Sequence, residues 1–137
     1  MVEVVNRQRQ KKIILDPWRA LARKTLNAVG KGEASATIAF VSDAKIRDLN
    51  RRFRGVDRVT DVLSFPTSES ETPDDLGDIA VSVERAEVQA KENGLTFDKE
   101  VAQLILHGLL HLCGYDHETD NGEMNRLELR VRRQLRI

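Results

Sequence analysis

The sequence predicts a single α+β domain that spans residues 1–137 and contains a mixed sheet. Short β-branched runs alternate with helical segments in the first part of the chain, and helices follow one another in the last part. The length of 137 residues, with 40% hydrophobic and 32% charged residues, suits one soluble domain. The formal net charge of zero argues against a globally cationic nucleic-acid-binding protein, although it leaves local basic patches open.

The chain opens with a strand–helix–strand pattern. The valine-rich run at 2–5 predicts a short strand, and ASATIAFVS at 34–42 predicts a second, because both are rich in β-branched and apolar residues. Between them, residues 15–32 predict a helix. We expect Asp16 to cap this helix before Pro17, which the first helical turn tolerates, and glycines to end it.

A second helix and a third strand follow. Ser42 or Asp43 can cap the helix, and TDVLSF at 60–65 predicts a strand that Pro66 stops. The residues that share one face of this helix are Ile46, Leu49, Asn50 and Phe53.

The rest of the chain predicts a loop, a strand and three helices. The acidic, turn-rich segment SESETPDDLGD at 68–78 is expected to form an exposed loop, and IAVS at 79–82 a strand. The predicted helices run from Ser82 through Asn93, over residues 97–114 with a cap near Asp98 and an end at Gly114, and from Asp120 onward.

All three histidines of the chain fall within one stretch, LHGLLHLCGYDHETD at 106–120. His107 and His111 are four residues apart, so they project from the same face of a helix that is apolar all round and therefore buried. Unpaired imidazoles are costly to bury, whereas an i, i+4 pair binds zinc well. Gly114 permits a left-handed turn that can bring His117 back toward the pair. Three histidine ligands leave a fourth position open for water, which is typical of catalytic zinc sites.

The same histidine spacing is found in metzincin-type metalloproteases, so a metallohydrolase of another substrate class is one alternative. A zincin, however, carries a glutamate directly after the first histidine as its general base, and this chain has Gly108 there. Asp116 could orient a metal ligand or, less readily, act as the base. The residues leave the general base unassigned.

A basic stripe lies on the second predicted helix and its following turn. Most of these arginines are expected to form a solvated helix face. An arginine in a cleft beside a metal would nevertheless bind phosphate through two donors and stabilise charge on phosphorus. A local stripe on a neutral chain suits contact with RNA at one face. The stripe consists of Arg47, Arg51, Arg54 and Arg58.

Several blocks of the sequence resemble the YbeY family of bacterial rRNA maturation endoribonucleases. HGLLHLCGYDH at 107–117 looks like the family signature H-G-x-L-H-L-x-G-Y-D-H, and LNRRFRGVDRVTDVLSFP at 49–66 resembles its second hallmark. LGDIAVS at 76–82 and the C-terminal E-M-x-x-x-E are also similar. The departures are small: Phe53 stands where an aromatic residue, often tyrosine, precedes the family's arginine, and Val59 where proline is frequent.

The resemblance implies a zinc ion on His107, His111 and His117 and a functional arginine at Arg54. It implies a single-strand-specific endoribonuclease that acts in 16S rRNA 3′-end maturation, ribosome biogenesis and late-stage 70S ribosome quality control. The implied partners are RNA of the small ribosomal subunit, a small-subunit ribosomal protein and a ribosome-assembly GTPase. The implied fold places the ligand helix at the centre, flanked by a mixed four-stranded sheet and further helices. A non-catalytic ribosome assembly factor with a structural metal is the second alternative.

The sequence also bears on the cellular compartment. Cys113 is the single cysteine, so an intramolecular disulfide is excluded. The N-terminal segment lacks the apolar stretch of a signal peptide, and no run has the length of a transmembrane helix. We therefore expect a cytoplasmic protein with no membrane partner.

Overall fold

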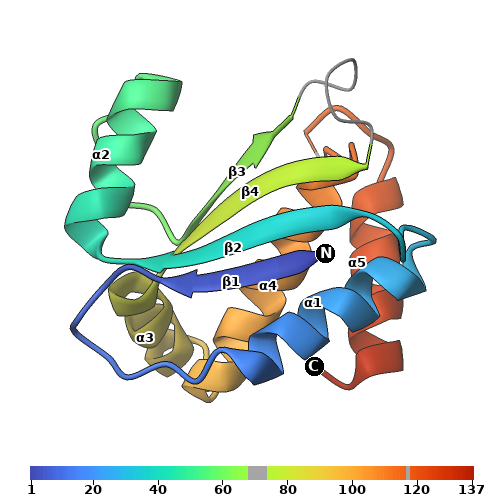
Figure 1. The fold of residues 1–137 in the computed structure, drawn as a ribbon, viewed down its shortest axis with the longest axis horizontal. Coiled ribbons are helices and arrows are strands. Elements are labelled where there is room, and N and C mark those ends of the chain that lie inside the picture. The colour runs from blue at the N-terminus through green and yellow to red at the C-terminus, as the bar shows by residue number, and fades with distance from the viewer. Residues whose placement is uncertain (68–73, 117) are drawn as a thin grey trace.

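The computed structural model describes residues 1–67, 74–116 and 118–137 and contains a four-stranded mixed sheet in these ranges (Figure 1). The strand order is β1-β2-β4-β3. β1, β2 and β4 run parallel, and β3 pairs antiparallel with β4 at one edge. This arrangement confirms the predicted α+β class and the four-stranded mixed sheet. The strands are β1 Val2–Asn6, β2 Ser35–Val41, β3 Val62–Pro66 and β4 Asp75–Ser82.

The described ranges contain five helices, and one of them is central. α4 contacts β3, β4, α1, α3 and α5. Figure 1 shows α1, α3, α4 and α5 gathered on one side of the sheet, with α2 on the other. None of the described helices combines the length and the apolar composition that crossing a bilayer requires. The helices are α1 Asp16–Ala28, α2 Asp43–Arg54, α3 Val83–Glu92, α4 Phe97–Leu112 and α5 Glu123–Leu135.

The alternation of side chains along the strands builds a core on each face of the sheet. On β2, Ile38 and Phe40 pack into the large core under α1, α3 and α4, whereas Val41 packs with Ile46 of α2 on the opposite face. Apolar residues surround α4, as expected for a helix buried among five other elements. The two-sided core therefore fixes the sheet between α4 and α2.

Gly108 brings α4 unusually close to the sheet. A Cβ atom at this position would lie 3.0–3.3 Å from three side-chain carbons of Ile79 on β4. The Ser64 hydroxyl of β3 donates a hydrogen bond of 3.2 Å to the Gly108 carbonyl. A side chain at this position would force Ile79 to shift, so the glycine allows the close packing of α4 on the sheet.

Some predicted element boundaries are wrong. α1 is capped by Leu15 without a side-chain hydrogen bond, and Asp16 is its first residue, where the carboxylate pairs with Arg19. α4 is capped by the Thr96 hydroxyl rather than near Asp98. In each case the helix extends beyond the expected cap, because a carboxylate is also favourable inside the first turn, near the positive end of the helix dipole.

Two larger expectations also need correction. Residues 75–78 belong to β4 rather than to an exposed loop, because pairing with β2 and β3 extends the strand beyond its apolar segment. Residues 68–73 lie outside the described ranges. The predicted common face of α2 is only partly buried: Ile46 and Asn50 are buried, whereas Phe53 is 61% exposed. The last turn of α2 extends past the sheet core.

We expect Gly108→Val to destabilise the fold. Overpacking a tight core contact costs about 1–3 kcal/mol. The gain in helix propensity from replacing glycine is less than about 1 kcal/mol, so the packing loss dominates. Urea unfolding of the wild type and the variant measures the difference. The loss should shrink in an Ile79→Ala background, where the opposing side chain is gone; an equal loss in both backgrounds would contradict the packing explanation.

Candidate metal centre

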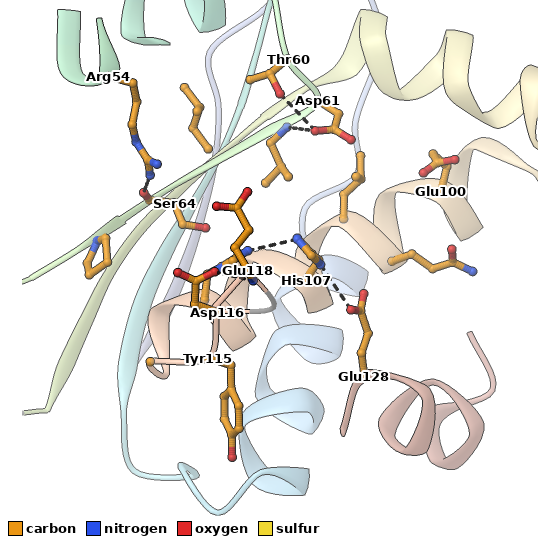
Figure 2. A pocket seen from close by; sticks show the side chains of 17 residues that line it. Arg54, Thr60, Asp61, Ser64, Glu100, His107, Tyr115, Asp116, Glu118 and Glu128 are labelled. Atoms are coloured by element: carbon orange, nitrogen blue, oxygen red, sulfur yellow. Dashed lines mark hydrogen bonds and ion pairs between the residues drawn. The ribbon is translucent and has the colours of Figure 1, made fainter. Parts of the chain in front are cut away.

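A cleft of about 750 Å³ opens between the edge strand β3 and the C-terminal half of α4 (Figure 2). Its described lining comes from the end of α2, the turn before β3, β3 itself, α4, the turn after α4, and α5. The cleft therefore brings together segments that are far apart in the sequence. It contains His107, His111, Gly114, Asp116 and Arg54, which the sequence singled out.

The His107 and His111 side chains converge on one point. They lie one turn apart near the end of α4, and their Nε2 atoms are 3.1 Å from each other. The two rings are nearly perpendicular, with an interplanar angle of 81°. Two nitrogens bound at about 2.1 Å to one tetrahedral zinc ion lie roughly 3.4 Å apart. The spacing of this pair therefore fits a shared metal ion.

Glu128 of α5 holds the other nitrogen of His107. Its Oε2 atom lies 3.3 Å from His107 Nδ1, and Figure 2 shows the carboxylate directed at the ring. This contact raises the pKa of His107 above its usual value. Burial of the ring lowers the pKa, and the negative charge of Asp61 raises it by a smaller amount. A carboxylate on Nδ1 favours the tautomer that presents Nε2 to a metal.

Sequence reasoning gave Glu128 no role in the site. It is 21 residues from His107, and only the packing of α5 on α4 brings the two together. The C-terminal E-M-x-x-x-E block contains Glu128 and was a signal that could have identified it.

The turn after α4 holds two of the predicted site residues, Gly114 and Asp116. Gly114 has the expected positive φ, +97°, and its backbone N–H donates to the His111 carbonyl. Asp116 lines the cleft, and its Oδ1 atom accepts a hydrogen bond of 3.0 Å from the backbone of Glu118. Its action on a metal ligand stays a prediction. His117 lies outside the described residues, so its role as a ligand also stays a prediction.

Arg54 reaches the edge of the cleft from the last residue of α2. Its Nη2 atom donates a hydrogen bond of 2.6 Å to the Ser64 carbonyl on β3 (Figure 2). The other arginines of the predicted stripe lie outside the cleft lining. Arg47 pairs with Asp57, and Arg51 pairs with Asp48, each at 2.8 Å. Two of the four stripe arginines are thus paired with carboxylates, and Arg54 is the member that lines the histidine cleft.

The position of Gly108 also explains why the chain lacks the glutamate that follows the first histidine in zincin metalloproteases. It follows His107 in sequence but faces Ile79 and the sheet, away from the cleft. A glutamate there would meet the core rather than a metal-bound ligand. The site therefore has the histidine spacing of a zincin without the position for a zincin's base.

The fold and the cleft define a small α+β protein with a candidate metal centre built on two histidines of a buried helix. The sequence model of the family described as endoribonuclease YbeY matches residues 3–136. The chain belongs to the YbeY family.

Relatives at the level of single proteins agree with this membership. A protein named endoribonuclease YbeY from Desulfitobacterium hafniense is 48% identical over 75% of this chain and 73% of its own length. One of the same name from Chelativorans is 42% identical over 87% and 77%. The solution structure of a Thermotoga maritima protein shares 32% identity with a TM-score of 0.67, and the match covers 99% of this chain and 92% of that one.

We expect Glu128→Gln to weaken zinc binding by about 10–100-fold, the usual effect of removing a carboxylate that supports a histidine ligand. Competition between the protein and a chelating zinc indicator measures the affinity. Glu87→Gln is the matched control, because Glu87 is a helical glutamate that pairs with Lys11 and lies outside the cleft lining. Equal zinc affinity of the wild type and Glu128→Gln would show that the contact does not support the site.

Proposed function

We propose that this protein is a zinc-dependent endoribonuclease that cleaves single-stranded RNA in 16S rRNA 3′-end maturation, ribosome biogenesis and 70S ribosome quality control. The observation that carries the proposal is the convergence of His107 and His111 in a cleft whose edge is formed by Arg54. Family relatives named endoribonuclease support RNA hydrolysis as the reaction. Contacts with a small-subunit ribosomal protein and a ribosome-assembly GTPase, and action in the cytoplasm, belong to the same proposal.

The histidines would form the metal centre. His107, His111 and His117 would hold one zinc ion, with Glu128 fixing the ring of His107. Zinc bound there would supply Lewis-acid activation of water or of a phosphate oxygen. Three protein ligands leave room for such chemistry, which a closed structural site does not.

The charge of the cleft supports a need for a cation. Its described lining holds one arginine and five carboxylates, so on its own it repels the phosphates of RNA. A metal ion at the histidines would offset part of this negative charge. The carboxylates are Asp61, Glu100, Asp116, Glu118 and Glu128.

Arg54 would bind the phosphate that enters the cleft. Its guanidinium already lies at the cleft edge and uses one donor for the Ser64 carbonyl, which leaves further donors of the planar group for a phosphate. Charge-assisted hydrogen bonds from arginine strengthen as negative charge grows on phosphorus, so they lower the barrier rather than only improving binding.

The two alternatives are not favoured. A metalloprotease of the zincin type needs a general base at position 108, and here Gly108 occupies that position and faces the sheet. A non-catalytic assembly factor does not account for relatives that are named as endoribonucleases. Incubating the metal-quantified protein with single-stranded rRNA fragments and with peptides tests the choice directly. Cleavage of peptides without cleavage of RNA would overturn the proposal.

We expect Arg54→Ala to lower RNA cleavage by roughly a hundredfold, the typical loss for a group that stabilises transition-state charge. Zinc content should be unchanged. Stability should fall by only about 1 kcal/mol or less, the net value of a single hydrogen bond such as that to Ser64. Arg54→Lys should recover part of the activity, because an ammonium keeps the charge but loses the planar two-donor geometry.

Arg51→Ala is the control for Arg54→Ala. It removes the same charge from the same helix, but Arg51 pairs with Asp48 and lies outside the cleft lining. Single-turnover cleavage, elemental analysis and thermal melting of each variant separate the effects. Equal loss of cleavage in both alanine variants would indicate a diffuse basic surface and no special role for Arg54.

We also expect zinc removal to weaken RNA binding itself, by about tenfold or more, because the acidic lining then repels the phosphates. Fluorescence anisotropy with a labelled single-stranded RNA measures binding before and after chelation, and again after zinc is restored. His111→Ala should bind RNA weakly with or without zinc. Identical RNA affinities of the metal-free and zinc-loaded wild type would contradict the electrostatic argument.

A further inference from the structure

A second hollow lies on the other face of the edge strand β3. This groove has a volume of about 730 Å³ and is built from the last turns of α2, from β3 and from β4. It shares Arg54, Ser64 and Pro66 with the histidine cleft, so the two hollows adjoin at β3. The residues that give the groove its character are Leu49, Phe53, Phe65 and Asp78.

An exposed aromatic ring forms one wall of the groove. Phe53 is 61% exposed, and it is the one aromatic residue among the large hydrophobic side chains that are exposed in the described ranges. Its ring packs edge-on with Phe65, with centroids 5.5 Å apart and an interplanar angle of 69°. Because Phe65 packs into the core under α2, it holds Phe53 in place. The ring is therefore supported by Phe65 and largely exposed, with the Arg52 guanidinium carbon 5.7 Å from its centroid.

The groove differs from the cleft in its chemistry. It is mainly apolar, and its carboxylate is Asp78, whose pKa is raised by burial and by the neighbouring Asp75. A second negative charge beside Asp78 is unfavourable, so a phosphate belongs at Arg54 and not in the groove. A flat, uncharged ring suits both the apolar wall and the aromatic partner.

We propose that this groove is a nucleobase subsite, in which a base next to the phosphate bound by Arg54 stacks on Phe53. The inference rests on the proposed endoribonuclease function and names how that site holds its substrate. A nucleotide carries a phosphate and a base within one residue, and Arg54 stands at the boundary of the two hollows. The RNA backbone passes over the open edge of β3, with the phosphate on the histidine side and the base on the phenylalanine side.

This arrangement accounts for a preference for single strands. A base that enters the groove must first leave its stacked neighbours and any base-pairing partner. For an unpaired nucleotide the free-energy cost of this step is low. Stacking accepts every base because each has a π-face, so the subsite selects strandedness more than sequence.

The test compares Phe53→Ala, Phe53→Tyr and Phe53→Leu in binding and single-turnover cleavage of a labelled single-stranded RNA. We expect the alanine variant to bind about tenfold more weakly, the usual loss when one stacked base loses its aromatic partner. The tyrosine variant should match the wild type, and the leucine variant should be as weak as the alanine variant. Val88→Ala, which trims an exposed apolar residue of α3 outside the groove, should bind normally.

A series of RNAs with single abasic nucleotides tests the position of the base. In the wild type, one abasic position beside the cleaved phosphate should weaken binding as much as Phe53→Ala does. In the Phe53→Ala background, the same abasic position should have no further effect. Unchanged melting of the variants separates this result from misfolding.

Several outcomes overturn the inference. If the Phe53→Ala variant binds RNA as tightly as the wild type and still cleaves it, the subsite is refuted. The proposed endoribonuclease function would stand. Full binding by Phe53→Leu would refute stacking, and additive losses in the abasic series would place the base elsewhere. Loss of a protein partner by Phe53→Ala, with normal RNA binding, would make the groove a protein-docking surface. A wild type that neither binds nor cleaves RNA would overturn the proposed function, and the subsite with it.

Discussion

The contact between Gly108 and the sheet is the constraint on which the cleft depends. A helix places successive side chains about 100° apart, so the rotation of α4 decides which of its residues face the core. Gly108 against Ile79, with its carbonyl bonded to the Ser64 hydroxyl, fixes that rotation. His107 and His111 then point along β3 into the cleft. A small turn of the helix about its axis would bury both imidazoles among the apolar side chains.

The strand β3 separates two environments with different chemistry. On the α4 side, histidines and carboxylates make a polar cleft that suits a cation. On the α2 side, two phenylalanines make an apolar groove. Arg54 is the residue common to both sides that carries a positive charge. Because β3 is an edge strand, the RNA chain of the proposed substrate would pass from one environment to the other without crossing the core.

Local patterns in the sequence predicted the fold class and the histidine pair, because helix periodicity and i, i+4 spacing are properties of neighbouring residues. Contacts between distant segments could not be predicted in this way. Glu128 meets His107 only after α5 packs on α4, and Arg54 meets Ser64 only after α2 crosses to β3. β4 is longer than its apolar run for the same reason, since strand pairing determines where it begins. The exposure of Phe53 could not be predicted either, because helix periodicity shows which residues share a face but not which of them the sheet covers.

The hydrogen bond from Arg54 to the Ser64 carbonyl has a consequence for self-association. An open sheet edge is a template on which a strand of another molecule can add, and β3 is such an edge. The Arg54 guanidinium already occupies the Ser64 carbonyl, and Pro66 has no N–H to donate. Both positions are therefore closed to pairing with another strand along this five-residue strand. The same side chain that would receive a phosphate thereby occupies a position at which a strand of another molecule would pair.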